Sequence, residues 1–283
     1  MSKDDLLERV KKSMAASVGV VAFLRGIGLG QSQPYTTTIS PGGRLVVNVN
    51  GIYIGYIVDA PFFEKSWFHP AEIDIAAKFE EYTQGILKES KPRVYSGLHP
   101  YSHIYRDAET AFKIAKNVGV PLDFVILLLA IGHDSIEDRA NIRAHLKQLD
   151  NTLITKDYEG MRGIGQKLQN ERTQAYNEIK RKLLDYLAET RIKGDERDKL
   201  KRGIITTADL ILDLTRFPDQ YPYALSMAHQ YKKIGSERLD SVLRRAFVKN
   251  CDRISNLEEY SPPSNDIIKI IAAVFRNDNY TVS

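Results

Sequence analysis

A histidine and an aspartate stand side by side at positions 133 and 134, directly after an apolar run, and a second acidic pair, Glu137 and Asp138, follows them. If helical geometry persists for a turn, Glu137 lies four residues past His133 and Asp138 four residues past Asp134, so the two pairs stack on adjoining faces. Acids at the end of a buried helix are costly, and they are tolerated when they coordinate a cation or face a polar cleft. These four residues are therefore candidates for chemistry.

A His-Asp step alone is also typical of a hydrogen-bonded structural pair, so further partners have to be found. His103 lies 30 residues before His133, and Asp252 lies within KNCDRISNL, residues 249–257. Two imidazoles and two carboxylates suit a hard or borderline divalent ion such as Mn²⁺, with positions left open for water and substrate oxygens. The set is compatible with metal-assisted hydrolysis.

The order His103, then His133-Asp134, then Asp252 resembles the HD-domain phosphohydrolases, all-helical enzymes that hold a divalent metal with such a set. HDSIED, residues 133–138, is similar to the HDxxED motif of the RelA/SpoT hydrolase domain, which acts on the stringent-response alarmones ppGpp and pppGpp. KNCDRISNL is similar to KLADRLHNL of that family, and SGLHPYSH, residues 96–103, resembles SGEPYIIH. The resemblance extends roughly over residues 70–260, with gaps.

The resemblance implies an active site as well as a fold. It implies one Mn²⁺ per chain, or another divalent metal in its place, with four ligands: His103, His133, Asp134 and Asp252. It also implies that Glu137 and Asp138 organise and activate the attacking water.

Substrate contacts follow from the same resemblance. Asn256 is expected to contact the nucleotide, and Ser96 belongs to the matching Ser-Gly motif. The family places an arginine that stacks on the base two residues before this motif. Here Val94 has that position and Arg93 lies one step earlier, so Arg93 is the candidate for base recognition.

The function implied is Mn²⁺-dependent hydrolysis of the 3′ pyrophosphate of ppGpp- or pppGpp-like alarmones by a small stand-alone enzyme, with release of pyrophosphate. One alternative is an HD-domain nucleotide phosphatase acting on a deoxynucleotide, NADPH or an adenosine alarmone. Another is a binding protein that senses a nucleotide or serves as an antitoxin against a toxic alarmone synthetase. The preference between guanine and adenine stays open.

Helical apolar spacing dominates the chain from residue 70 onward and predicts the elements that position these residues. Helices are expected over residues 71–90, over 105–118 with a stop near Gly119, and over 121–138. The third is apolar all round from Phe124 to Ile131, which predicts a central position in the bundle. A charged stretch at about 150–202 predicts a solvated helix pair inserted into the domain. Two more helices are expected at about 223–233 and 237–259.

The first 68 residues are predicted to form a small N-terminal α+β extension, with a helix at about 3–14 followed by a small sheet. Asn50-Gly51 between runs rich in Val, Ile, Thr and Tyr is a strong hairpin signal. Residues 69–283 are expected to form the HD domain. The predicted fold class is mainly α, an HD-domain helical bundle with a small N-terminal β-hairpin or sheet extension.

Composition limits the partners. The chain has 283 residues, a net charge of +4 and a single cysteine, Cys251, which excludes an intrachain disulfide and a cysteine-cluster metal site. The mild positive charge suits a phosphorylated small molecule and does not by itself indicate nucleic acid. We expect a cytoplasmic protein with a nucleotide substrate and no membrane contact. A homo-oligomer or a toxin partner is compatible with the sequence.

Overall fold

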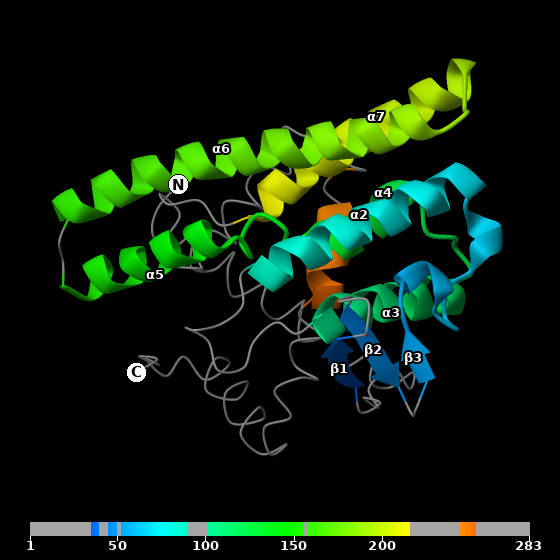
Figure 1. Cartoon of the computed structure of the whole chain (residues 1–283), viewed down its shortest axis with the longest axis horizontal. Coiled ribbons are helices and arrows are strands. Elements are labelled where there is room, and N and C mark those ends of the chain that lie inside the picture. The colour runs from blue at the N-terminus through cyan, green and yellow to red at the C-terminus, as the bar shows by residue number, and fades with distance from the viewer. Residues whose placement is uncertain are drawn as a thin grey trace.

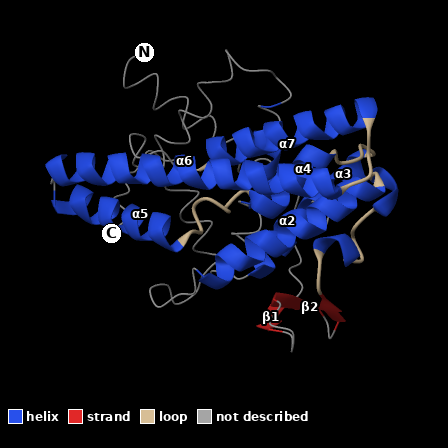
Figure 2. Cartoon of the chain, turned by 45° about the horizontal axis from the view of Figure 1, so that its top comes forward, coloured by secondary structure: helices blue, strands red, loops and turns tan. Residues whose placement is uncertain are grey.

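The computed structural model describes residues 35–39, 45–49, 52–89, 101–155, 158–215, 241 and 244–252. Most of these residues are helical (Figures 1 and 2), which confirms the prediction of a mainly α protein. The helices are α2 (Pro70–Glu89), α3 (Tyr101–Val118), α4 (Phe124–Gly132), α5 (Ala140–Thr155), α6 (Tyr158–Glu189) and α7 (Gly194–Leu214). Residues 244–252 are also helical. None of the described helices has a stretch both long and apolar enough to cross a membrane.

A three-stranded antiparallel sheet precedes the helices. Its order is β1 (Tyr35–Ile39), β2 (Leu45–Val49), β3 (Ile52–Ile54), and Thr37 pairs with Val47 while Asn48 pairs with Tyr53. β1 and β2 lie against α3, and Figure 1 shows the sheet at one edge of the helical part. The helix predicted at 3–14 and the one predicted at 223–233 lie outside the described residues.

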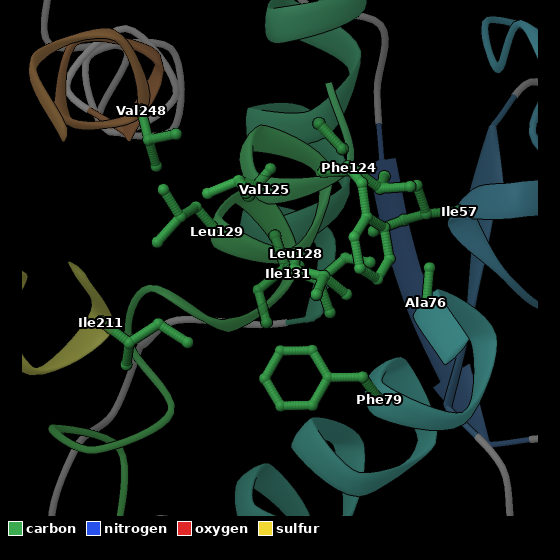
Figure 3. Close-up of a cluster of buried hydrophobic side chains, with 14 of the residues drawn as sticks. Ile57, Ala76, Phe79, Phe124, Val125, Leu128, Leu129, Ile131, Ile211 and Val248 are labelled. Atoms are coloured by element: carbon green, nitrogen blue, oxygen red, sulfur yellow. The ribbon is translucent and has the colours of Figure 1, made fainter. Parts of the chain in front are cut away.

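α4 lies at the centre of the hydrophobic core. Its apolar residues Leu128 and Ile131 are fully buried between Phe79 of α2 and Ile211 of α7 (Figure 3). The helix begins at Phe124, three residues later than predicted from Pro121, and it ends at Gly132, so residues 133–138 form turns and not the predicted last part of the helix. The physical reason for the later start is the side chain of Asp123, which accepts a hydrogen bond from the backbone N–H of Ile126 at 2.9 Å and so caps the helix.

The charged stretch at 150–202 forms a helix pair, as predicted, but only one side of it faces solvent. α6 packs against both α5 and α7, and α7 packs against α4. An apolar stripe at helical spacing enters the core from this pair: Leu168, Ala175, Ile179, Leu183, Leu187, Leu200 and Ile204. The prediction of a solvated helix pair thus holds for one side only, and the buried stripe was not predicted because many charged residues surround it in the sequence.

The segment before α2 also belongs to the core. This segment contains two short 3-10 helices, η1 (Ile57–Asp59) and η2 (Lys65–Trp67). Ile57 and Val58 of η1, and Phe63 and Phe68 on either side of η2, belong to the same hydrophobic cluster as the helical residues. The buried carboxylate of Glu80 on α2 accepts a hydrogen bond from the backbone N–H of Ile57. The predicted boundary between residues 68 and 69 thus falls between segments that share one hydrophobic core.

Candidate metal centre

Three segments far apart in sequence bring the candidate ligands together. His103 lies in the first turn of α3, His133 and Asp134 directly follow α4, and Asp252 ends the described helical residues 244–252. His133 continues the hydrogen-bonding pattern of α4, since its backbone N–H donates to the carbonyl of Leu129 at 2.9 Å. The central helix therefore delivers the His-Asp step to the place where α3 begins.

Ion pairs hold the third segment in place. Arg244 forms an ion pair with Asp123, the cap of α4, at 2.7 Å, and the side chain of Arg245 contacts Asp213 of α7 at 2.8 Å. The helix that carries Asp252 is thereby fixed both to the start of α4, whose other end carries His133, and to α7. Asp252 is nearly fully buried.

The two imidazoles face a set of carboxylates at short range. Nε2 of His103 lies 3.2 Å from Oδ1 of Asp252 and 3.8 Å from Oδ2 of Asp134. Nε2 of His133 lies 3.2 Å from Oδ2 of Asp134. The ring centroids of the two histidines are 5.7 Å apart. The structure thus brings the four predicted ligands together in one buried cluster.

Asp107 is a fifth member that the sequence analysis missed. It lies one turn after His103 on α3, is fully buried, and its Oδ2 is 3.5 Å from Nε2 of His103 and 3.2 Å from Nε2 of His133. The spacing of four residues after a candidate histidine was the available signal, because residues i and i+4 share a helix face. Within the charged segment YRDAETAFKIAK, however, an aspartate looks like part of a solvated face.

The geometry fits one divalent ion. One ligand atom each from His103, Asp107, His133 and Asp252 can be chosen so that all four lie within 4.8 Å of one another. Metal–oxygen bonds of about 2.1 Å in an octahedron place ligand atoms about 3 to 4.2 Å apart. Asp134, partly exposed beside His133, adds a further carboxylate at the edge of this group.

Buried polar atoms give a separate test of the fit. Among the described residues, Nε2 of His133 and both carboxylate oxygens of Asp107 are buried without a hydrogen bond of acceptable geometry. Buried polar atoms normally have a partner, and their desolvation is costly without one. A cation between these atoms would satisfy them, so the donor set fits a metal site. It is a mixed imidazole and carboxylate set, which is typical of Mn²⁺, Fe²⁺ or Zn²⁺ sites.

Comparison of the chain with models of protein families, with curated proteins and with solved structures gives no match. What the centre can do chemically therefore has to follow from its own donors, charges and burial.

Burial and the charges of neighbouring groups shift the pKa values of the side chains in the centre. Burial raises the pKa of Asp107 to about 6, against the opposing effect of the two imidazoles. Burial alone would lower the pKa of His133, but the Asp134 and Asp107 carboxylates raise it to about 10. The pKa of Asp252 is held well below its usual range despite burial, because Lys249 and His103 stabilise its charge.

Charged groups pair closely around the imidazoles. Lys249 contacts Asp252 at 2.5 Å, and Arg143 contacts Asp138, so each of these carboxylates has a cationic partner. Asp107 and Asp134 each lie close to both imidazoles. A divalent ion between these side chains would add positive charge where carboxylates gather.

The acidic pair after the His-Asp step lies next to this centre. The backbone N–H of Asp138 donates to the carbonyl of Asp134 at 2.8 Å, so the expected helical turn is present between these two residues. The Asp138 side chain is buried, while Glu137 is partly exposed. Burial and the charge of Asp134 raise the pKa of Asp138 to about 7, against the lowering effect of Arg143. A carboxylate that titrates near neutrality is suited to proton transfer.

The predicted substrate contacts lie outside the described residues. Arg93 and Ser96 precede the start of α3 at Tyr101, and Asn256 follows residue 252. Their roles in binding the base and the nucleotide stay predictions.

Proposed function

We propose that this chain is a metal-dependent phosphohydrolase of the HD type, which uses Mn²⁺ to remove the 3′ pyrophosphate from ppGpp- or pppGpp-like alarmones. The observation that carries the proposal is the convergence of His103, His133, Asp134 and Asp252 from three distant segments, with all of them buried except the partly exposed Asp134. These residues follow one another along the chain in the order of the motifs that resemble the RelA/SpoT hydrolase domain.

The two imidazoles and the carboxylates of Asp107, Asp134 and Asp252 would hold the ion. When bound, a divalent ion neutralises phosphoryl oxygens and lowers the pKa of a coordinated water toward neutrality. Lys249, paired with Asp252, keeps that carboxylate ionised and available as a ligand. The buried position of the histidines keeps bulk water away from their Nε2 atoms.

Asp138 is the proton acceptor in the proposed reaction. The water oxygen attacks the phosphorus bonded to the ribose 3′ oxygen, a new P–O bond forms, and the bond to the 3′ oxygen breaks. Asp138 accepts the proton of the water, and the 3′ oxygen leaves as a hydroxyl after taking up a proton. The products are pyrophosphate and the nucleoside 5′-diphosphate or 5′-triphosphate, which carries a free 3′ hydroxyl. Glu137 orients the water from the same turn.

Asp138→Asn tests this assignment. The amide cannot accept the proton, so we expect turnover to fall by about 10²- to 10⁴-fold. Bound Mn²⁺, quantified by elemental analysis after desalting, should equal that of the wild-type protein because Asp138 is not among the proposed ligands. Loss of the metal in this variant would contradict the separation of ligands from proton acceptor.

The substrate is tested by incubating the full chain and Mn²⁺ with ppGpp, pppApp, NADPH and deoxynucleotides, and resolving the products by anion-exchange chromatography. We expect pyrophosphate from an alarmone. Orthophosphate from another nucleotide would overturn the alarmone assignment and favour a nucleotide phosphatase. A protein without turnover and without stoichiometric metal would favour the binding-protein alternative.

A further inference from the structure

Arg143 connects α5 with the centre. It lies in the first turn of α5, where its backbone N–H donates to the carbonyl of Arg139 at 2.9 Å. Its Nη2 donates to Oδ1 of Asp138. The side chain of Arg143 is 22% exposed and that of Asp138 is 6% exposed, so the arginine is the solvent-side partner of the pair.

Asp138 has Arg143 as a cationic partner, and its backbone is bonded to a proposed metal ligand. The backbone carbonyl of Asp134 accepts a hydrogen bond from the backbone N–H of Asp138 at 2.8 Å, and the charge of Asp134 acts on the Asp138 side chain. Removal of a cationic partner makes a buried carboxylate less favourable, so that it tends to turn toward solvent or take up a proton.

We propose that Arg143 is a positioning residue, which holds the Asp138 carboxylate toward the metal centre so that it faces the attacking water. This inference rests on the proposed function, because it takes Asp138 as the proton acceptor. Arg143 does not belong to the ligand set, and no motif of the sequence analysis includes it.

Arg139 offers a matched control four residues away. Its side chain is 19% exposed and forms an ion pair with Glu178 of α6 at 2.8 Å, and it also donates to the hydroxyl of Tyr82 on α2. Arg139 thus resembles Arg143 in residue type, exposure and charge pairing, but its guanidinium is directed at α2 and α6. If the loss of activity reflects only the removal of a partly exposed ion pair, kcat should fall equally in Arg139→Gln and Arg143→Gln.

The kinetic test compares Arg143→Gln, Arg143→Lys, Arg139→Gln, Asp138→Asn and the double variant of Arg143 and Asp138, with ppGpp and Mn²⁺. We expect Arg143→Gln to lower kcat by about 10- to 100-fold with KM and Mn²⁺ affinity unchanged, and Arg143→Lys to recover part of the loss. Arg139→Gln should keep the wild-type kcat.

The double variant should be no slower than Asp138→Asn alone, since both changes remove the same function. Additive losses, or equal losses in the two arginine variants, would overturn the proposal.

A second measurement does not depend on turnover. The longitudinal relaxation rate of water protons around the Mn²⁺-loaded protein reports on water in contact with the ion. We expect Asp138→Asn and Arg143→Gln to change this rate alike and Arg139→Gln to leave it unchanged. If Arg143→Gln leaves the rate at the wild-type value, Arg143 does not position Asp138. A wild-type protein that binds Mn²⁺ but does not cleave ppGpp would refute the proposed substrate, while this comparison would still decide the role of Arg143.

Discussion

At the scale of single residues, the centre contains one carboxylate more than the motif resemblance implies. Asp107 is fully buried and its Oδ2 lies within 3.5 Å of Nε2 of both histidines. A third carboxylate beside Asp134 and Asp252 increases the negative charge around a bound ion. It should therefore strengthen the binding of a divalent cation that it helps to coordinate.

Asp107→Asn should therefore weaken Mn²⁺ binding. We expect the dissociation constant to rise by about 10- to 100-fold, the range found when supporting carboxylates of metal sites are removed. Competition with a fluorescent chelator measures the affinity. Glu109→Gln is the control, because Glu109 lies on the same helix, is partly buried and pairs with Lys113 away from the cluster. Equal Mn²⁺ affinity of Asp107→Asn and the wild-type protein would show that Asp107 is not part of the metal site.

Several of the candidate residues could be predicted from the sequence because their types and order are informative. His103, His133, Asp134 and Asp252 were named from motifs and do cluster. Asp107 and Arg143 were missed for a physical reason: aspartates and arginines in charged helices usually face solvent. Only the packing of α3 and α5 shows that these two side chains are turned toward the centre.

At the scale of elements, the position of the His-Asp step depends on close packing of α2, α4 and α7. Gly132 immediately precedes His133, and a Cβ atom at this position would lie 2.4 Å from the Phe79 ring and 3.2 Å from Cδ1 of Ile211. Phe79 is fully buried, so its ring has little room to move. The absence of a side chain at Gly132 is what lets the end of α4 approach α2.

Gly132→Ala should consequently separate these helices and destabilise the fold. Overpacking of this kind typically costs about 1 to 3 kcal/mol in the free energy of unfolding, which urea denaturation measures. In Gly203→Ala on α7 the new Cβ would meet Phe124 at an ordinary 3.5 Å. That control should be neutral or gain up to about 1 kcal/mol from helix propensity. Equal effects of the two substitutions would show that α2 and α4 tolerate the extra atom.

A polar connection joins α2, the turn after α4 and α6. Glu178 on α6 accepts hydrogen bonds from Arg139 at 2.8 Å and from the hydroxyl of Tyr82 at 2.9 Å. Burial alone would raise the pKa of Glu178, but these hydrogen bonds and the Arg139 charge lower it below its usual 4.5. A lowered carboxyl pKa stabilises the fold above the pKa of the unfolded chain, and this contribution is lost as the pH falls through the folded-state pKa.

Glu178→Gln should therefore be less stable than the wild-type protein at neutral pH, and the difference should shrink below about pH 4.5. Urea midpoints measured at pH 7 and at pH 4 give this difference directly. The effect is small because the glutamate is more than a third exposed and water screens its charge. A difference that grows toward acidic pH would contradict the sign of the linkage.

Element positions show what periodicity alone can predict. α2, α3 and the start of the apolar α4 were expected within a few residues, because their apolar spacing is clear, but the end of α4 was predicted at Asp138 and lies at Gly132. α4 starts after Asp123 and not at Pro121, because the Asp123 side chain caps the helix through a specific hydrogen bond. The buried face of α6 was not predicted, because charged residues surround Leu183 and Leu187 in the sequence. In the structure, α2 and α7 pack against α6 and bury these leucines.

At the scale of the whole molecule, the centre ties together parts of the chain that are distant in sequence. His103, His133 and Asp252 come from three separate segments, and a bound ion would cross-link them in the folded state only. Ligands that bind the folded state alone stabilise it by mass action. The metal is thus expected to act on global stability as well as on chemistry.

Addition of Mn²⁺ at about 100 times its dissociation constant should stabilise the fold by about 2.7 kcal/mol. For a protein of this size the Tm should rise by about 5 to 10 °C, as measured by differential scanning fluorimetry, and a chelator should reverse the shift. Asp252→Asn should lose the response. An unchanged Tm at saturating Mn²⁺ would indicate that the ion does not bind preferentially to the folded chain.

The measurement that tests the central claim most directly is an anomalous difference map, recorded at the manganese absorption edge, from crystals of the full chain grown with Mn²⁺. We predict one peak per chain at bonding distance from Nε2 of both His103 and His133 and from carboxylate oxygens of Asp107, Asp134 and Asp252. A map without a peak between these side chains, or with its peak at another site, would contradict the assignment of this cluster as a metal centre.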